Sequence, residues 1–130
     1  MAPLPPIFLA LVEAGFPSPA DDWIEDALDL NKLLIKKPTA TYFLRVKGDS
    51  MIGAGIHEHD LLIVDRSISP AHNDVVIASV LGDLTVKRLH REQDAVRLVP
   101  DNPGYDPIEV TQEMDLRIWG VVTYSLHKVR

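Results

Sequence analysis

The chain has 130 residues, of which 46% are hydrophobic and 25% charged, a composition typical of one soluble globular domain. It contains no cysteine, which excludes disulfides, cysteine nucleophiles and thiolate metal sites. The formal net charge is −6, and residues 1–31 carry acidic side chains with no Lys or Arg, whereas the remainder balances to zero. Because binding to a nucleic-acid backbone needs a basic surface, we expect protein partners instead of direct DNA binding.

The first part of the chain, residues 1–40, is predicted to be a flexible arm with one short helix. Five of its prolines fall within the first 19 residues, around the apolar run Ile7–Val12, which favours an extended, mobile segment over a packed element. That run is too short to cross a membrane and lacks a basic flank, so a cytoplasmic location without membrane contact is expected. Ser18 and Pro19 predict the start of a helix that ends before Pro38.

The second part, residues 41–130, is predicted to be β-rich. Short β-branched and aromatic runs alternate with turn residues, the pattern of a mostly β domain of short, twisted antiparallel strands. Gly82-Asp83 predicts a tight hairpin turn, and three prolines predict a loop over residues 100–107. Strands are expected at residues 41–47, 61–65, 75–81, 84–89, 95–99 and 116–126.

Ser50 is a candidate nucleophile. It stands in Gly48-Asp49-Ser50-Met51 directly after a predicted strand, where a small residue lets the backbone turn sharply and present the hydroxyl. The same four residues also fit an ordinary turn with no chemical role.

Lys87 is a candidate base for that hydroxyl. It lies in a predicted strand whose period-two alternation places Thr85, Lys87 and Leu89 on one face. Burial on an apolar face disfavours the ammonium form and lowers the pKa of a lysine. The alternative is a lysine that protects a sheet edge from aggregation.

The histidines give no catalytic triad. His57 and His59 surround Glu58 in what is predicted to be a polar turn before a strand, and metal binding by the pair is the less favoured interpretation. His72 and His127 are interpreted as surface or chain-end residues. Accordingly, neither a metal nor an organic cofactor is expected.

Several motifs in order resemble the UmuD proteins of the LexA-like self-cleaving serine proteases. They are Thr41-Tyr42-Phe43, Gly48-Asp49-Ser50-Met51, the run Asp60–Asp65, Thr85-Val86-Lys87 and Gly120-Val121-Val122, with an interval of 37 residues between the serine and the lysine. The resemblance covers the chain from about Glu13 to the end. It implies a Ser/Lys dyad, with Ser50 as nucleophile and neutral Lys87 as general base, and an oxyanion held by the backbone amides of Asp49 and Ser50.

The resemblance also implies self-cleavage between Ala14 and Gly15. Such proteins are cut between a small residue and a glycine upstream of the serine, and a glycine without Cβ permits close approach to the nucleophile. Without the family pattern, this dipeptide is more often a joint in a loop.

Two features depart from the UmuD type: the arm before the bond is short and rich in proline, and Ala14 stands where a cysteine is expected. Alanine occurs at this place in LexA-type repressors, so the departure does not affect the chemistry.

The expected function is that of a UmuD-like SOS mutagenesis protein. By resemblance, it is a homodimer that a RecA filament on single-stranded DNA stimulates to cut itself, and residues 15–130 then join a UmuC-type translesion DNA polymerase as accessory subunit. The main alternative is the catalytic and dimerisation core of a LexA-like or phage-type repressor. That protein would need a basic DNA-binding domain, which the first 40 residues are too few to form, and the first 31 of them contain no Lys or Arg. A membrane-bound signal peptidase would need a transmembrane anchor, and a catalytically silent homologue is the remaining alternative.

Overall fold

A computed structural model describes residues 3–8, 14–15 and 24–130. The chain divides into two compact units, residues 1–36 and 37–130, and each is described here by itself. The sequence analysis predicted the boundary between the two parts of the chain after residue 40. Within the described residues, no helix has the length and apolar character needed to cross a membrane.

The first unit contains a small antiparallel sheet and a short helix. Strand β1 (Pro6–Phe8) pairs with β2 (Ile24–Ala27), and helix α1 covers Leu30–Leu34. The helix begins late because Asp29 caps it, accepting a hydrogen bond of 3.0 Å from the backbone N–H of Asn31. The predicted helix was therefore wrong over β2, which pairs as a strand, and its predicted start at Ser18 and Pro19 lies outside the described residues.

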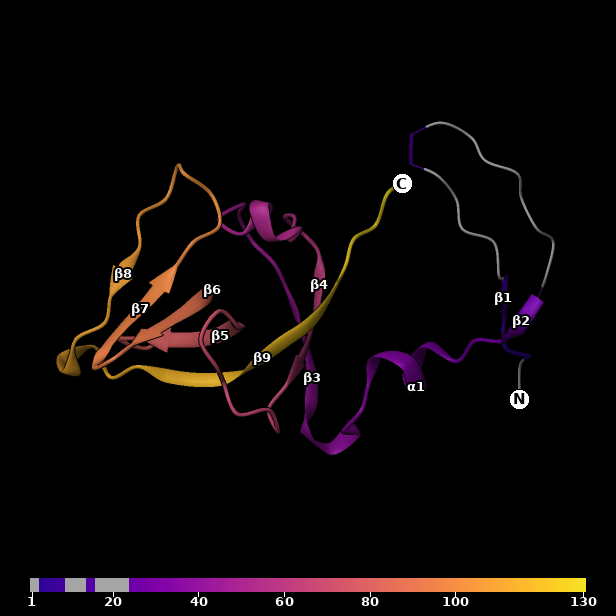
Figure 1. Ribbon diagram of the computed structural model, residues 1–130, viewed down its shortest axis with the longest axis horizontal. Coiled ribbons are helices and arrows are strands. Elements are labelled where there is room, and N and C mark those ends of the chain that lie inside the picture. Colours follow the sequence, from indigo (N-terminus) through magenta and orange to yellow (C-terminus); the bar gives the residue numbers. More distant parts are fainter. Residues whose placement is uncertain (1–2, 9–13, 16–23) are drawn as a thin grey trace. The chain divides into compact units, whose positions relative to one another are not determined.

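The second unit is one antiparallel sheet of seven strands with three single turns of 3-10 helix (Figure 1). The strand order is β3-β4-β9-β5-β6-β7-β8. In chain order the strands are β3 (Thr41–Arg45), β4 (Leu61–Asp65), β5 (Val75–Val80), β6 (Asp83–Glu92), β7 (Ala95–Val99), β8 (Ile108–Glu109) and β9 (Arg117–Leu126), and the 3-10 turns are η1 (Pro38–Ala40), η2 (Ile52–Ala54) and η3 (Gln112–Met114).

The mostly β fold is confirmed, and all six predicted strands of this unit are present within a few residues of their expected ends. Strand β8 was not predicted, because two residues give no alternation. The hairpin turn was predicted one residue too late. Leu81 and Gly82 form it, both with positive φ (53° and 87°), and Val80 pairs with Asp83. Two positive φ angles match the twist of the adjoining strands, and Leu81 adopts one at a conformational cost.

The sheet is strongly bent where its strands change register. Strand β9 pairs with β4 and with β5, and each ladder contains a register shift, at Ile63/Val64 and at Ile77/Ala78. Such bulges bend a strand and increase its twist. Gly120 lies between them, and a Cβ there would come within 2.5 Å of the Val64 side chain. Residues at the end of β3 and in β6 line one cavity, although three strands separate β3 from β6 in the sheet.

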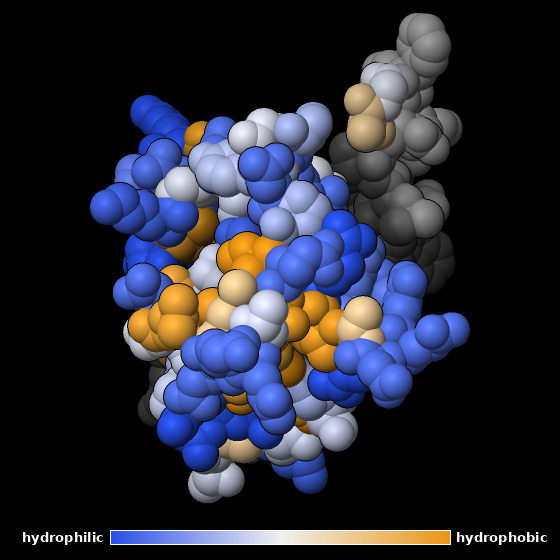
Figure 2. Space-filling model, turned by 90° about the vertical axis from the view of Figure 1, so that its left-hand side faces the viewer, coloured by the Kyte–Doolittle hydropathy of each residue, from blue (hydrophilic) through white to orange (hydrophobic). Residues whose placement is uncertain are grey.

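Two hydrophobic clusters stabilise the unit, and alternate residues of β5 belong to different clusters. Ile77 lies in the first, with Met51 and Leu62, whereas Val76 and Ala78 lie in the second, with Leu89 and Leu98. This is the period-two alternation of a strand covered on both faces. Figure 2 views the side that bears β7 and β8, where hydrophobic residues gather in the middle of a hydrophilic surround.

Candidate active site

Ser50 lies on a turn whose conformation depends on two nearby residues, Gly48 and Met51. Gly48 has a φ of +86°, which an L side chain rarely adopts, so the chain can reverse directly after β3. Met51 is 1% exposed and anchors the turn in the first hydrophobic cluster. The intervening Ser50 is only partly buried. The turn therefore presents the serine hydroxyl at the surface of a fixed core.

The loop after β7 holds the same turn from outside. The backbone N–H of Asp101 donates to the carbonyl oxygen of Ser50 at 2.8 Å, and Asn102 Nδ2 donates to the carbonyl oxygen of Asp49 at 3.0 Å. The Tyr105 hydroxyl donates to Asp49 Oδ1 at 2.6 Å, which raises the pKa of Tyr105. Sequence reasoning predicted this loop and missed its role, because proline spacing indicates a loop without indicating what it contacts.

Lys87 reaches the serine from the middle of β6, where it pairs with Val76 of β5. Its Nζ lies 3.0 Å from Ser50 Oγ, 2.8 Å from Thr85 Oγ1 and 3.1 Å from the carbonyl oxygen of Val86. The contact with Thr85 agrees with the face that alternation predicted for both residues. The structure thus brings together the two side chains that the sequence singled out, 37 residues apart.

The surroundings of Lys87 favour its neutral form. Burial lowers the pKa of the Lys87 ammonium below its ordinary value, since a charge loses hydration in the sheet. Among the described residues, no carboxylate forms an ion pair with it. Arg88, the next residue, is instead paired with Asp101, with 3.2 Å between Nη2 and Oδ2. Arg88 is therefore paired with a carboxylate, whereas the hydrogen bonds of Lys87 involve only hydroxyl and carbonyl oxygens.

A neutral Lys87 amine can satisfy all three of its contacts. It has two N–H groups and one lone pair, and the Val86 carbonyl can only accept a hydrogen bond. If the second N–H donates to Thr85 Oγ1, the lone pair faces the hydroxyl of Ser50. This arrangement is the one in which the amine can take a proton from the serine.

The two side chains line a cavity of about 250 Å³ between the end of β3 and β6. Leu44, Leu62 and Ile77 supply apolar walls, and Lys47 and Thr85 also line it. The backbone N–H groups of Asp49 and Ser50 donate no hydrogen bond to any described residue. Unused amide donors beside a serine hydroxyl can stabilise an oxyanion.

The other predicted site residues belong to other segments of the chain. Ala14 and Gly15 are exposed residues of the first unit, in a bend. His57 and His59 do not form a pair, because His59 has a φ of 71° and its side chain is 82% exposed, whereas His57 lies beside Asp60. His127 was interpreted as a chain-end residue, and the structure places it against Asp60 as well.

Comparison with known proteins assigns this serine-containing β domain to a class. The family model described as Peptidase S24-like matches residues 6–123. Protein ImpA of Salmonella typhimurium is 45% identical over 126 residues, which make up 96% of this chain and 85% of ImpA. Protein MucA of Salmonella typhimurium is 40% identical over 93% of this chain and 83% of its own length. LexA repressor 1 of Geobacter sulfurreducens is 42% identical over 86% of this chain and 55% of the repressor.

The chain therefore belongs to the Peptidase S24-like family, and its general class is that of a self-cleaving serine peptidase. Within the family it is a UmuD-like SOS mutagenesis protein, like ImpA and MucA. This assignment holds over the repressor alternative, because the similarity extends over most of ImpA and MucA but over 55% of the LexA repressor. The expected family and function are thus confirmed.

Proposed function

We propose that Ser50 and Lys87 form a catalytic dyad that cuts the chain once, between Ala14 and Gly15. The observation that supports the dyad is the distance of 3.0 Å between Lys87 Nζ and Ser50 Oγ at a cavity in the sheet. A nucleophile and its base must lie within about 2.6–3.2 Å of each other. The membership of the chain in a family of self-cleaving peptidases supplies the reaction class.

In the proposed reaction, Ser50 Oγ attacks the carbonyl carbon of Ala14 while Lys87 Nζ takes the hydroxyl proton. The negative charge that develops on the carbonyl oxygen is stabilised by the backbone amides of Asp49 and Ser50. The C–N bond then breaks, and the ammonium of Lys87 gives its proton to the leaving amine of Gly15. Water hydrolyses the resulting ester of Ser50 by the same proton transfers, so the step balances with water as the only co-reactant.

The two residues at the scissile bond suit a close approach of backbone to the serine. Gly15 has no atom within 4 Å of the position that a Cβ would occupy, and both residues are exposed. Small side chains let the backbone at the scissile bond come close to Ser50 Oγ. The stretch between Gly15 and Ser50 could span about 100 Å if extended, so the bond can be cut within one chain or between two chains.

The partners that we propose for this protein are inferred from its similarity to ImpA and MucA. The protein acts as a homodimer, a RecA filament on single-stranded DNA stimulates the cut, and residues 15–130 then serve a UmuC-type translesion polymerase as accessory subunit. The uneven charge supports the choice of protein partners, because the acidic start of the chain is unsuited to a DNA backbone.

Intact-mass analysis of the purified full chain tests this function. The protein is incubated with and without RecA filaments, at neutral and at alkaline pH, beside the variants Ser50→Ala and Lys87→Ala. We expect loss of residues 1–14 from the wild type only, with a faster cut when RecA filaments are present. The matched controls are Ser69→Ala and Lys36→Ala, which remove an exposed serine and an exposed lysine.

Two results would contradict the proposal. A wild-type chain that stays intact under all these conditions would exclude self-cleavage. Cleavage in either dyad variant, or at another bond, would exclude the assigned residues or the assigned site. Circular dichroism of each variant establishes that loss of cleavage reflects lost chemistry and not lost folding.

A further inference from the structure

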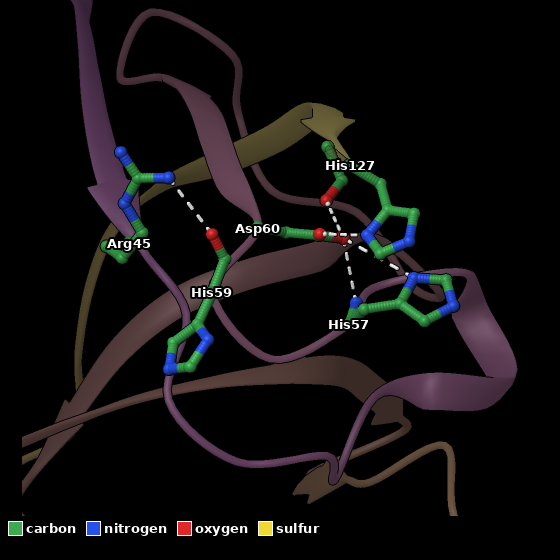
Figure 3. Close-up of polar contacts among 6 residues, drawn as sticks. Arg45, His57, His59, Asp60 and His127 are labelled. Atoms are coloured by element: carbon green, nitrogen blue, oxygen red, sulfur yellow. Dashed lines mark hydrogen bonds and ion pairs between the residues drawn. The ribbon is translucent and has the colours of Figure 1, made fainter. Parts of the chain in front are cut away.

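His57, Asp60 and His127 form a cluster that the proposed reaction does not use (Figure 3). His57 and Asp60 belong to the segment before β4, and His127 directly follows β9. The pairing of Leu61 with Leu126 brings these segments together. Sequence reasoning paired His57 with His59, because only the strand register reveals that His127 is the neighbour.

The carboxylate of Asp60 is buried and already held in a fixed orientation. Its side chain is 1% exposed. Oδ2 accepts hydrogen bonds from the backbone N–H of His57 at 2.8 Å and from Ser125 Oγ at 2.9 Å. Oδ1 lies 2.6 Å from His127 Nδ1. Partners of this kind orient the ligands of a metal ion in known metalloproteins.

The two imidazole rings present the same nitrogen to this carboxylate. They stack with 4.1 Å between centroids and 25° between planes. His57 Nδ1 is a buried atom without any hydrogen-bond partner among the described residues, although Asp60 Oδ2 is 3.5 Å away. A buried nitrogen that lacks a partner costs free energy, so an additional group at this point would stabilise the arrangement.

We propose that His57, Asp60 and His127 bind one divalent transition-metal ion, and that Zn²⁺ fits the site. Two imidazole nitrogens and one carboxylate oxygen are ligands that zinc accepts, with open positions left for water. The three ligand atoms lie within 4.8 Å of one another. Zinc–ligand bonds of about 2.1 Å place tetrahedral ligands about 3.4 Å apart, close to the separation of His57 Nδ1 from Asp60 Oδ2.

Binding requires one rearrangement. The contact between His127 Nδ1 and Asp60 Oδ1 is a hydrogen bond, so the ion replaces the proton and the two atoms separate by about 1 Å. A neutral His127 ring then carries its proton on Nε2. The side chains of His57 and His127 are 43% and 45% exposed, which gives the ion a path from solvent and gives the rings room to adjust. The bound ion would join the end of β9 to the loop before β4.

Calorimetric titration of the EDTA-treated full chain with ZnCl₂ tests this site. The variants His57→Gln and His127→Gln each remove one ligand, and His59→Gln is the matched control. His59 lies two residues from His57, and Figure 3 shows its ring directed away from Asp60. Only its backbone takes part in the drawn contacts, accepting from Arg45 at 3.0 Å. His90→Gln controls for the other close histidine pair, His72 and His90.

We expect one Zn²⁺ per chain, a loss of affinity of at least about tenfold in each ligand variant, and no change in either control. Zinc should also raise the melting temperature of the wild type, because it binds the folded chain. In nitrogen-15 spectra of the wild type, zinc should shift the signals of His57 and His127 and leave His59 unchanged, a measurement that needs no variant. Absence of stoichiometric binding, equal binding in the ligand variants, or loss of binding in the controls would overturn the proposal.

Discussion

The backbone N–H of Asp101 donates to the carbonyl oxygen of Ser50 at 2.8 Å, so the loop after β7 fixes the turn that carries the proposed nucleophile. The carbonyl oxygen of Asp101 in turn accepts from the backbone N–H of Gly53 at 2.8 Å. The turn is thus bonded to this loop on both sides of Met51. Because Arg88 of β6 pairs with the Asp101 side chain, the loop also connects the turn to the strand of Lys87.

The contact at Gly53 leaves no room for a methyl group. A Cβ there would lie 2.7 Å from the carbonyl oxygen of Asp101. Gly53→Ala is therefore expected to push the loop away from Ser50 and to lower the self-cleavage rate by about tenfold to a hundredfold. Gel densitometry of the cleaved fraction over time measures the effect. The control Gly104→Ala adds the same group to the loop after β7 itself, where the nearest atom, Asn102 Oδ1, is 3.4 Å away, and should cleave at the wild-type rate. Equal cleavage rates in the two variants would contradict the proposal that the loop after β7 positions Ser50.

The Tyr105 hydroxyl is expected to act on the rate through Asp49. Tyr105→Phe removes its hydrogen bond of 2.6 Å to Asp49 Oδ1 and should slow self-cleavage by about threefold to tenfold. The shape of the pH–rate profile should stay the same, since Lys87 is untouched. Asp49→Asn retains an oxygen that can accept from Tyr105 and should lose less activity. An unchanged cleavage rate in Tyr105→Phe would contradict this role of Tyr105 and show that the other contacts of the loop are enough to hold the Ser50 turn.

Local patterns made Ser50 and Lys87 candidates: a glycine turn after a strand, and an alternating strand. The resemblance to the UmuD proteins then implied that the two residues form a pair. What holds the pair together could not be predicted from such patterns. The contacts of Asp101 and Tyr105 depend on how a proline-rich loop folds over a distant turn, and the meeting of His57 with His127 depends on a strand register. Local spacing carries neither kind of information.

The lowered pKa of Lys87 makes self-cleavage depend on pH. Only the neutral amine can accept the proton of Ser50, so the rate without RecA should rise with pH and level off below the ordinary lysine pKa of 10.5. Intact-mass time courses across alkaline buffers measure the profile. Lys36→Ala should reproduce it, whereas Lys87→Arg should remain uncut because a guanidinium stays protonated. A profile that is still rising above 10.5 would exclude Lys87 as the group that titrates.

The same shift in the pKa of Lys87 has a consequence for stability. A lysine whose pKa is lower in the folded than in the unfolded chain destabilises the fold fully at pH values below its folded pKa. As the pH rises toward 10.5, the unfolded chain also loses its proton and the penalty disappears. Lys87→Met keeps the length and apolar stem of the side chain without the charge. In a Ser50→Ala background, its advantage in free energy of unfolding should therefore be larger near neutral pH than at about pH 10.

Urea unfolding at the two pH values measures this difference. Lys36→Met is the matched control, because Lys36 is exposed and its replacement should change the free energy of unfolding equally at both pH values. A Lys87→Met advantage that stays constant or grows with pH would mean that Lys87 is not held as a destabilised base. If the advantage shrinks as expected, the fold bears a loss of stability near neutral pH because it buries, beside Ser50, an amine that gives up its proton more easily than an exposed lysine.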